Sequence, residues 1–127
     1  MKVAITGGLG FIGSAMVRHI LTDADHKILN IDSRTYAATE GSVQRSTRAH
    51  RYAHVNVDIC DAEALSATLN AYDPDVIIHM AAESHVDRSI DGPGQFIQTN
   101  IIGTYNLLQI ALETKARFVH VSTDEVF

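Results

Sequence analysis

Residues 6–14 read Thr-Gly-Gly-Leu-Gly-Phe-Ile-Gly-Ser, and they are the most informative part of the sequence for its fold. It follows a short apolar run, Lys2–Ile5, and it leads into apolar residues at helical spacing, including Ile12, Met16 and Ile20. A glycine-rich turn between a strand and a helix is typical of dinucleotide-binding units. Its glycines allow a tight turn, a close approach of the backbone to a pyrophosphate, and close packing of helix on strand. The N-terminus of the helix then offers its N–H groups to the phosphates.

An acidic residue stands where such a unit binds the adenosine ribose. Asp32 ends the next apolar run, Lys27–Asp32, nineteen residues beyond Gly13. A carboxylate at this point accepts hydrogen bonds from ribose hydroxyls and repels a 2′-phosphate, so the sequence predicts NAD rather than NADP. Arg34 lies nearby and could accommodate that phosphate, but a solvated loop charge is the simpler interpretation. A purely structural glycine turn is the alternative, and the position of Asp32 argues against it.

The rest of the chain alternates between apolar strands and helical repeats. Further strands are expected at 55–59, 76–80 and 117–122. One helix is expected to begin after the N-cap candidate Asp61 and to end before Pro74. A longer helix is indicated by apolar and small residues at helical spacing, Ile97, Ile101, Thr104, Leu108 and Leu112. Residues 35–51 are expected to form a loop with one helical turn. This alternation predicts an α/β fold with a doubly wound parallel sheet of Rossmann type and strand order 3-2-1-4-5. Residues 1–127 are expected to form one NAD-binding domain.

Composition narrows the class of protein. The chain has 127 residues, of which 46% are hydrophobic and 20% charged, as in an ordinary globular domain. The net charge of −5 disfavours a nucleic-acid partner, whose phosphates need a basic field. No apolar run approaches the roughly 18 residues that cross a bilayer, and no export segment is visible near Met1. The single cysteine, Cys60, cannot form an internal disulfide, so a reducing cytoplasm is expected.

Four of the histidines are expected to be structural residues and not metal ligands. His79 and His120 lie within apolar runs and are expected to be core residues that each have a hydrogen-bond partner. His50 and His54 are four residues apart, but no glutamate or cysteine completes a ligand pattern around them. No metal site is therefore expected.

Beyond these local patterns, the chain resembles the dTDP-glucose 4,6-dehydratases, which belong to the extended short-chain dehydrogenase/reductase enzymes that act on nucleotide sugars. The resemblance covers nearly the whole chain, and its most specific parts are AAESHVDRS and STDEV. Residues 38–51 depart from the family's usual pattern. The matching stretches are TGGLGFIGS at 6–14, NIDSRTYA at 30–37, DICD at 58–61, AAESHVDRSI at 81–90, FIQTNIIGTYNLL at 96–108 and VSTDEVF at 121–127.

The resemblance implies NAD as the cofactor and a sugar nucleotide, dTDP-glucose, as the substrate. It also implies that the NAD-binding domain 1–127 is incomplete, because the rest of the sheet and a C-terminal substrate domain, absent here, would follow. It places Ser84 and Thr123 against the sugar nucleotide, with Thr123 beside the catalytic pair Asp124 and Glu125. The implied cofactor contacts are Gly7, Gly10, Phe11, Ile12 and Gly13 at the pyrophosphate, Asp32, Ser33, Arg34 and Thr35 around the adenosine ribose, Asp58 and Ile59 beside the adenine, and Met80, Ala81, Ala82, Glu83, Ser84 and Thr99 along the remainder.

The reaction of this family needs two carboxyl groups with different protonation states. Hydride leaves C4 of the glucose, the resulting ketone acidifies the C5 proton, a carboxylate removes that proton, and an acid protonates the departing C6 hydroxyl. The pKa values of the two groups must therefore be pushed apart. The resemblance assigns Glu125 as the base and Asp124 as the acid. From the residues alone, an Asp-Glu pair after a strand is more typical of the start of a helix.

Two alternatives remain open at the level of sequence. The parent protein could be another sugar-nucleotide enzyme, such as a 4-epimerase, a UDP-glucuronate decarboxylase or a different hexose 4,6-dehydratase, although an epimerase does not need the pair Asp124 and Glu125. The chain could also act only as a nucleotide-binding fragment. The family's hydride step uses a tyrosine base with a lysine four residues later, and none of the four tyrosines has that partner here. The 127-residue chain is therefore expected to be inactive, and the resemblance implies a homodimer through the helix near 100–112.

Overall fold

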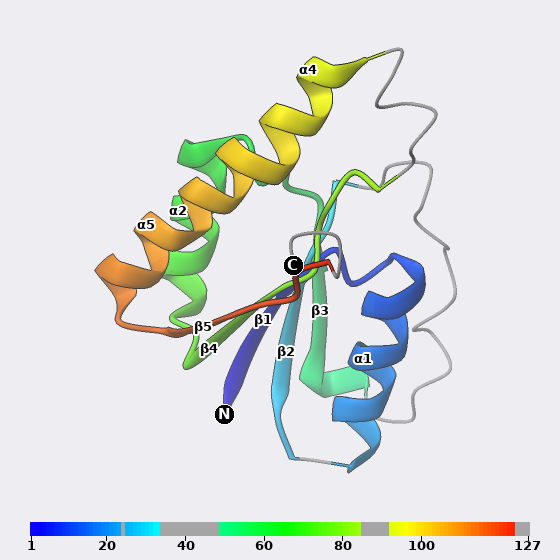
Figure 1. The fold of residues 1–127 in the computed structure, drawn as a ribbon. Coiled ribbons are helices and arrows are strands. Elements are labelled where there is room, and N and C mark those ends of the chain that lie inside the picture. The colour runs from blue at the N-terminus through cyan, green and yellow to red at the C-terminus, as the bar shows by residue number, and fades with distance from the viewer. Residues whose placement is uncertain (24, 34–48, 85–91, 124–127) are drawn as a thin grey trace.

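The computed structural model describes residues 1–23, 25–33, 49–84 and 92–123 and contains a five-stranded parallel sheet (Figure 1). The order of the strands is β3-β2-β1-β4-β5, which confirms the order predicted from the sequence. The central strand β1 pairs with β2 on one side and with β4 on the other, so Ile5 lies between Asn30 and Ile78. The strands are β1 (Lys2–Thr6), β2 (Lys27–Ile31), β3 (Tyr52–Val55), β4 (Val76–His79) and β5 (Arg117–His120).

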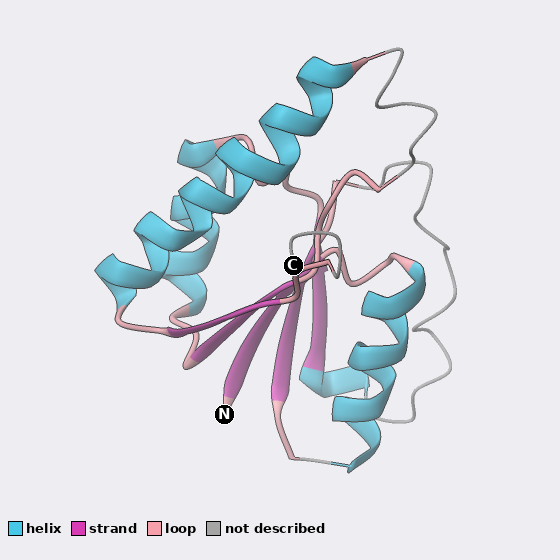
Figure 2. Ribbon diagram, in the orientation of Figure 1, coloured by secondary structure: helices cyan, strands magenta, loops and turns pink. Residues whose placement is uncertain are grey.

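Helices cover both faces of the sheet, as expected for a doubly wound fold. The helix α1 (Phe11–Asp23) packs on one face, and α2 (Ala62–Tyr72) and α5 (Thr104–Thr114) pack on the other (Figure 2). A short helix α4 (Pro93–Phe96) continues through a π-helical segment η2 (Ile97–Gly103) into α5, and together they form one long rod. A 3₁₀ turn η1 (Ala49–Arg51) precedes β3.

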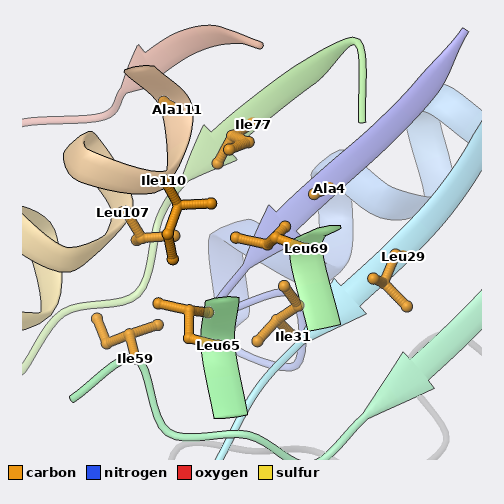
Figure 3. Packing of buried hydrophobic residues seen from close by; sticks show 10 residues of the cluster. All are labelled: Ala4, Leu29, Ile31, Ile59, Leu65, Leu69, Ile77, Leu107, Ile110 and Ala111. Atoms are coloured by element: carbon orange, nitrogen blue, oxygen red, sulfur yellow. The ribbon is translucent and has the colours of Figure 1, made fainter. Parts of the chain in front are cut away.

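Each face of the sheet has its own hydrophobic cluster. Under α1, Val17 and Leu21 pack on β-sheet residues Val3, Ile5 and Ile28. Figure 3 shows the larger cluster on the other face, where side chains of α2 and α5 meet those of the sheet. It comprises Ala4, Leu29, Ile31, Ile59, Leu65, Leu69, Ile77, Leu107, Ile110 and Ala111. Each Å² of apolar surface that is buried stabilises a protein by roughly 25 cal/mol, so these two clusters are the main source of stability.

The helix α2 begins and ends where the sequence predicts. The Oδ1 atom of Asp61 accepts the N–H of Ala64 at 3.0 Å and so caps the first turn. At the other end Asp73 adopts a left-handed conformation, with φ 53°, and its N–H donates to the carbonyl of Leu69. Pro74 then prevents the helix from continuing.

The third strand lies earlier than the sequence indicated. It was expected at 55–59, but β3 spans Tyr52–Val55, and Val55 pairs with Ile31, the last residue of β2. The next residues turn instead of extending, because Asp58 accepts the N–H of Cys60 on Oδ1 at 2.8 Å and the N–H of Asp61 on its carbonyl. The alternation of apolar residues around 57 and 59 therefore belongs to a loop that enters the core.

The apolar stripe that indicated the long helix lies on its outer side. Ile97, Ile101, Leu108 and Leu112 are 52%, 60%, 42% and 74% exposed. The helix instead presents Gly103, Leu107, Ile110 and Ala111 to the core. Both sets of residues repeat at helical spacing, and Gly103 lets the buried face come close to Ile59, because a Cβ there would lie 2.5 Å from the Ile59 side chain. In the part of the chain that the structure describes, no helix is long and apolar enough to cross a membrane.

Candidate nucleotide-binding site

The candidate site lies at the carboxyl ends of the strands, beside the point where the winding of the sheet reverses. The chain passes from β3 at one edge to β4 on the far side of β1, so the loops after β1 and β4 diverge there. Open α/β sheets bind ligands at such a switch point. Figure 1 shows the loop after β1 and the start of α1 at this end, opposite the N-terminus.

Two glycines give the loop after β1 its shape. Gly7 has φ 73°, a conformation that residues with a Cβ rarely adopt, and a Cβ there would lie 2.7 Å from the backbone N and Cα of Ala81. A Cβ on Gly13 would overlap the carbonyl group of Gly7, so α1 can begin close to the loop only because this position is glycine. The loop thus presents bare backbone at the switch point.

Side chains from β2 hold this loop in place. Asn30, which is fully buried, accepts the N–H of Gly8 on Oδ1 at 3.0 Å and donates from Nδ2 to the hydroxyl of Tyr52. Burial raises the pKa of that tyrosine hydroxyl, which keeps it protonated. Asp32 accepts the N–H of Leu9 on Oδ2 at 3.0 Å. The sequence analysis missed the role of Asn30, since a single polar residue in an apolar strand carries no signal of its partner.

The N-terminus of α1 forms one wall of the site. Phe11 and Ile12, at the start of the helix, are 93% and 65% exposed. The first turn itself contains no acidic residue that could occupy its N–H groups. This helix end, next to bare glycine backbone, is suited to hold an anion such as a pyrophosphate.

The residues expected around the adenosine lie at two neighbouring strand ends. Asp32 is 8% exposed and Ser33 is exposed. Of the predicted pair at 58 and 59, Asp58 is exposed, whereas Ile59 packs into the core under Gly103. Arg34 and Thr35 lie outside the described residues.

The loop after β4 forms the opposite wall. Met80 and Ala81 are half-buried, and Ala82 and Ser84 are exposed. Glu83 is held by η2, because the side chain of Asn100 accepts its N–H at 2.9 Å and donates to its carbonyl at 3.0 Å. The predicted cofactor contact Thr99 precedes Asn100 in η2 and is half-buried.

A buried histidine links these two walls. His79, 1% exposed at the end of β4, contacts the Thr6 hydroxyl through Nδ1 at 2.7 Å and the Thr104 hydroxyl through Nε2 at 2.8 Å. Its burial lowers its pKa to about 4, and the neighbouring His120 acts in the same direction. The prediction of a hydrogen-bonded core histidine is thus confirmed for His79. It is wrong for His120, which is exposed on the edge strand β5 although its ring stacks on that of His79.

The strand β5 leads toward the same edge. Val121 still donates its N–H to the carbonyl of His79, and Thr123 follows as an exposed residue. The expected acid and base, Asp124 and Glu125, lie outside the described residues. No group of three histidine, cysteine or acidic side chains that could hold a metal ion occurs within the described ranges.

Comparison with known proteins gives this geometry a family context. The family model for GDP-mannose 4,6 dehydratase matches residues 4–127. A dTDP-glucose 4,6-dehydratase of Salmonella typhimurium is 47% identical over all of this chain, and one of Neisseria meningitidis is 47% identical over 99% of it. In both cases the chain spans only 38% of the length of the relative.

Solved structures give the same picture. A dTDP-glucose 4,6-dehydratase of Streptomyces venezuelae, solved with NAD and TYD bound, is similar with a TM-score of 0.90 and 43% identity, over 99% of this chain and 40% of the other. A UDP-glucose 4-epimerase of Thermotoga maritima, solved with UDP-glucose, is similar with a TM-score of 0.86 and 25% identity, over 97% of this chain and 38% of the other.

Proposed function

This chain belongs to the GDP-mannose 4,6 dehydratase family, and from that premise we propose that residues 1–127 form the NAD-binding part of a longer dTDP-glucose 4,6-dehydratase. The observation that carries the proposal is the glycine loop, in which Gly7 and Gly13 bring bare backbone and the start of α1 together at the switch point. The 47% identity to a dTDP-glucose 4,6-dehydratase supports the choice of substrate. The parent enzyme would be a lyase that converts dTDP-glucose to dTDP-4-keto-6-deoxyglucose.

The residues of the site fit NAD. The loop from Gly7 to Gly13, with Phe11 and Ile12, would hold the pyrophosphate. Asp32 would accept hydrogen bonds from the adenosine ribose, and Asp58 would lie near the adenine. The loop 80–84 and Thr99 would line the rest of the cofactor. When bound, NAD supplies a hydride acceptor that later returns the hydride to the same sugar.

The elimination would be carried by the residues that follow β5. Thr123 would hold the glucose, and Ser84 would contact the sugar nucleotide from the loop after β4. Glu125 would remove the C5 proton, and Asp124 would protonate the leaving C6 hydroxyl. A Glu–Asp pair of this kind needs one ionised and one protonated member at the same pH.

We infer that the 127-residue chain binds NAD without completing the reaction. The sequence contains no tyrosine followed four residues later by lysine, so it lacks the base that the resemblance calls for in the hydride step. A 4-epimerase is the second candidate, because a UDP-glucose 4-epimerase has a similar fold. The pair Asp124 and Glu125 favours the dehydratase, since an epimerase has no water to eliminate.

Calorimetric titration with NAD and NADP tests the proposal. We expect saturable binding that prefers NAD. Asp32→Ala should weaken binding about 10- to 100-fold, because one or two charge-assisted hydrogen bonds to the ribose are lost. Asp32→Asn is the matched control: its amide oxygen can still accept the N–H of Leu9, so a loss in this variant is due to the ribose contact and not to a loosened loop. A folded chain that binds neither cofactor would refute the assignment.

We also infer that the protein forms a homodimer through the outer side of η2 and α5. The stripe Ile97, Ile101, Leu108 and Leu112 is exposed and runs along the rod. Exposed apolar surface of this extent on a soluble domain is typical of an interface. Two copies of the same stripe can pack against each other about a twofold axis.

A further inference from the structure

A chain of hydrogen bonds crosses the site from β1 to η2. It runs from the hydroxyl of Thr6, through the ring of His79, to the hydroxyl of Thr104 and on to the carbonyl of Asn100. Thr6 and His79 are 0% and 1% exposed. Thr6 directly precedes Gly7, and Asn100 holds the backbone of Glu83, so the chain connects the glycine loop with the loop after β4.

The two hydroxyl groups that contact the His79 ring, one at each nitrogen, both require the same protonation state of the ring. The Thr6 hydroxyl oxygen already accepts the N–H groups of Met80 and Ala81, each at 3.3 Å, so its own proton is directed to Nδ1 of His79. The Thr104 hydroxyl donates to the carbonyl of Asn100 at 2.8 Å, so it can only accept from Nε2. The ring must therefore be neutral, with its proton on Nε2.

We propose that neutral, Nε2-protonated His79 is a positioning residue that fixes the loop 80–84 against the glycine loop, through the hydroxyls of Thr6 and Thr104. The proposal rests on the function proposed above, because that loop is one wall of the NAD site. Both ring nitrogens of His79 contact protein hydroxyls, so its effect on a bound cofactor would be indirect. It acts through Ala81, whose backbone would collide with any side chain at position 7, and through Glu83, which Asn100 holds.

This arrangement explains why a polar residue stands within an apolar strand. An apolar side chain at 79 would leave the buried hydroxyl of Thr6 without its acceptor, and an unsatisfied buried polar group is costly. The sequence neighbours of His79 are apolar on both sides, so nothing local requires an imidazole here. The requirement comes from Thr6 on the neighbouring strand β1 and from Thr104 at the start of α5.

The role of His79 is tested in the 127-residue chain, first without ligand and then by titration with NAD. Nitrogen-15 NMR of the His79 ring at pH 7 should show Nε2 protonated and Nδ1 unprotonated. In Thr104→Val, which is isosteric and lacks the hydroxyl, the amides of Ala81 and Glu83 should exchange with solvent about tenfold faster, and the Kd for NAD should rise about tenfold. Thr104→Ser keeps the hydroxyl and should restore both values.

A second variant on the same helix controls for a general loss of stability. The Thr114 hydroxyl donates to the carbonyl of Ile110 at 2.8 Å, as that of Thr104 does to Asn100, but Thr114 is not one of the hydroxyls that contact the His79 ring. Thr114→Val should therefore leave the amides and the Kd unchanged. A proton on Nδ1 of His79 in the unmodified chain, or equal effects of the two valine variants, would overturn the proposal. If the unmodified chain does not bind NAD, the proposed function fails, while the ring and amide measurements still decide whether His79 positions the loop.

Discussion

Gly7 is the residue on which the shape of the glycine loop most directly depends. Its N–H donates to the carbonyl of Ile31, and its own carbonyl accepts the N–H of Gly10, so the residue ties β2 to the start of α1. Its left-handed conformation and the nearby backbone of Ala81 both exclude a side chain. Neither constraint can be relieved by rotating a side chain, because the colliding atoms belong to the backbone.

Gly7→Ala should therefore destabilise the protein by about 2–4 kcal/mol and abolish NAD binding, since strain and steric overlap add. Gly94→Ala is the matched control, because a Cβ there meets nothing within 4 Å, and alanine favours a helix. It should be neutral or slightly stabilising. Urea denaturation of both variants measures the difference, and equal stabilities would contradict the role given to Gly7.

His79 makes the stability of the protein depend on pH. Its pKa in the folded chain is about 4, against 6.5 for an unperturbed histidine, because burial and the neighbouring ring of His120, stacked at 5.1 Å, disfavour the charged form. The unfolded chain therefore binds a proton between pH 6.5 and pH 4 that the folded chain does not. This contribution to the free energy of unfolding is complete above pH 6.5 and decreases as the pH falls toward 4.

We expect the loss from His79 to reach on the order of 3 kcal/mol at pH 4. His79→Gln removes the titrating group, so its free energy of unfolding should fall less steeply between pH 6.5 and pH 4 than that of the parent. Urea denaturation at a series of pH values gives both curves. Parallel curves would show that His79 titrates normally.

At the scale of elements, α2 shows how far local sequence determines structure. Asp61 caps its first turn, Leu65 and Leu69 form its buried face, and the pair Asp73 and Pro74 ends it. All of these signals lie within the helix or next to it, so they could be read without knowledge of the fold. The same cannot be said of β3, whose end depends on where its partner β2 ends.

Replacing the cap tests this account of α2. Asp61→Ala should lower the free energy of unfolding by about 1 kcal/mol, because the N–H of Ala64 loses its acceptor. Asp61→Asn, which keeps an oxygen acceptor, should lie within about 0.5 kcal/mol of the parent. Thermal denaturation of the three proteins makes the comparison. A loss in the asparagine variant as large as in the alanine variant would mean that charge, not the capping hydrogen bond, matters at this position.

Among the residues that the structure describes, two exposed apolar surfaces lie away from the glycine loop with Phe11 and Ile12. One is the stripe on η2 and α5, and the other is the edge strand β5, where Val119 and Val121 are 47% and 45% exposed. An exposed edge strand can pair with another chain, whereas a helical stripe favours packing of helices. The dimer proposed above uses the stripe.

A charge placed in the stripe should therefore separate the copies. Sedimentation velocity over a concentration series should show a dimer for the parent and a monomer for Ile101→Glu combined with Leu108→Glu, because burying two unpaired carboxylates is unfavourable. Ala67→Glu, on the exposed side of α2, is the control and should remain dimeric. An unmodified chain that is monomeric at every concentration would refute the dimer, and a dimer that survives both charges would place the interface elsewhere.

The sequence by itself determined the class of fold, the strand order, the glycine loop and the limits of α2. These follow from spacing, turn residues and caps, which act over a few residues. The placement of Asp32 at the end of β2 and of the loop 80–84 at the end of β4 also followed, since parallel strands bring their carboxyl ends to one edge.

Only the tertiary structure decided which face of α5 is buried, where β3 ends, and why Asn30 and His79 are polar. Two apolar stripes on one helix are equivalent until the rest of the chain packs against one of them, and here Gly103 allowed the close approach to Ile59. The partners of His79 lie 73 and 25 residues away in the chain. A buried polar side chain is specified by the groups that fold around it, and a single sequence does not record those distances.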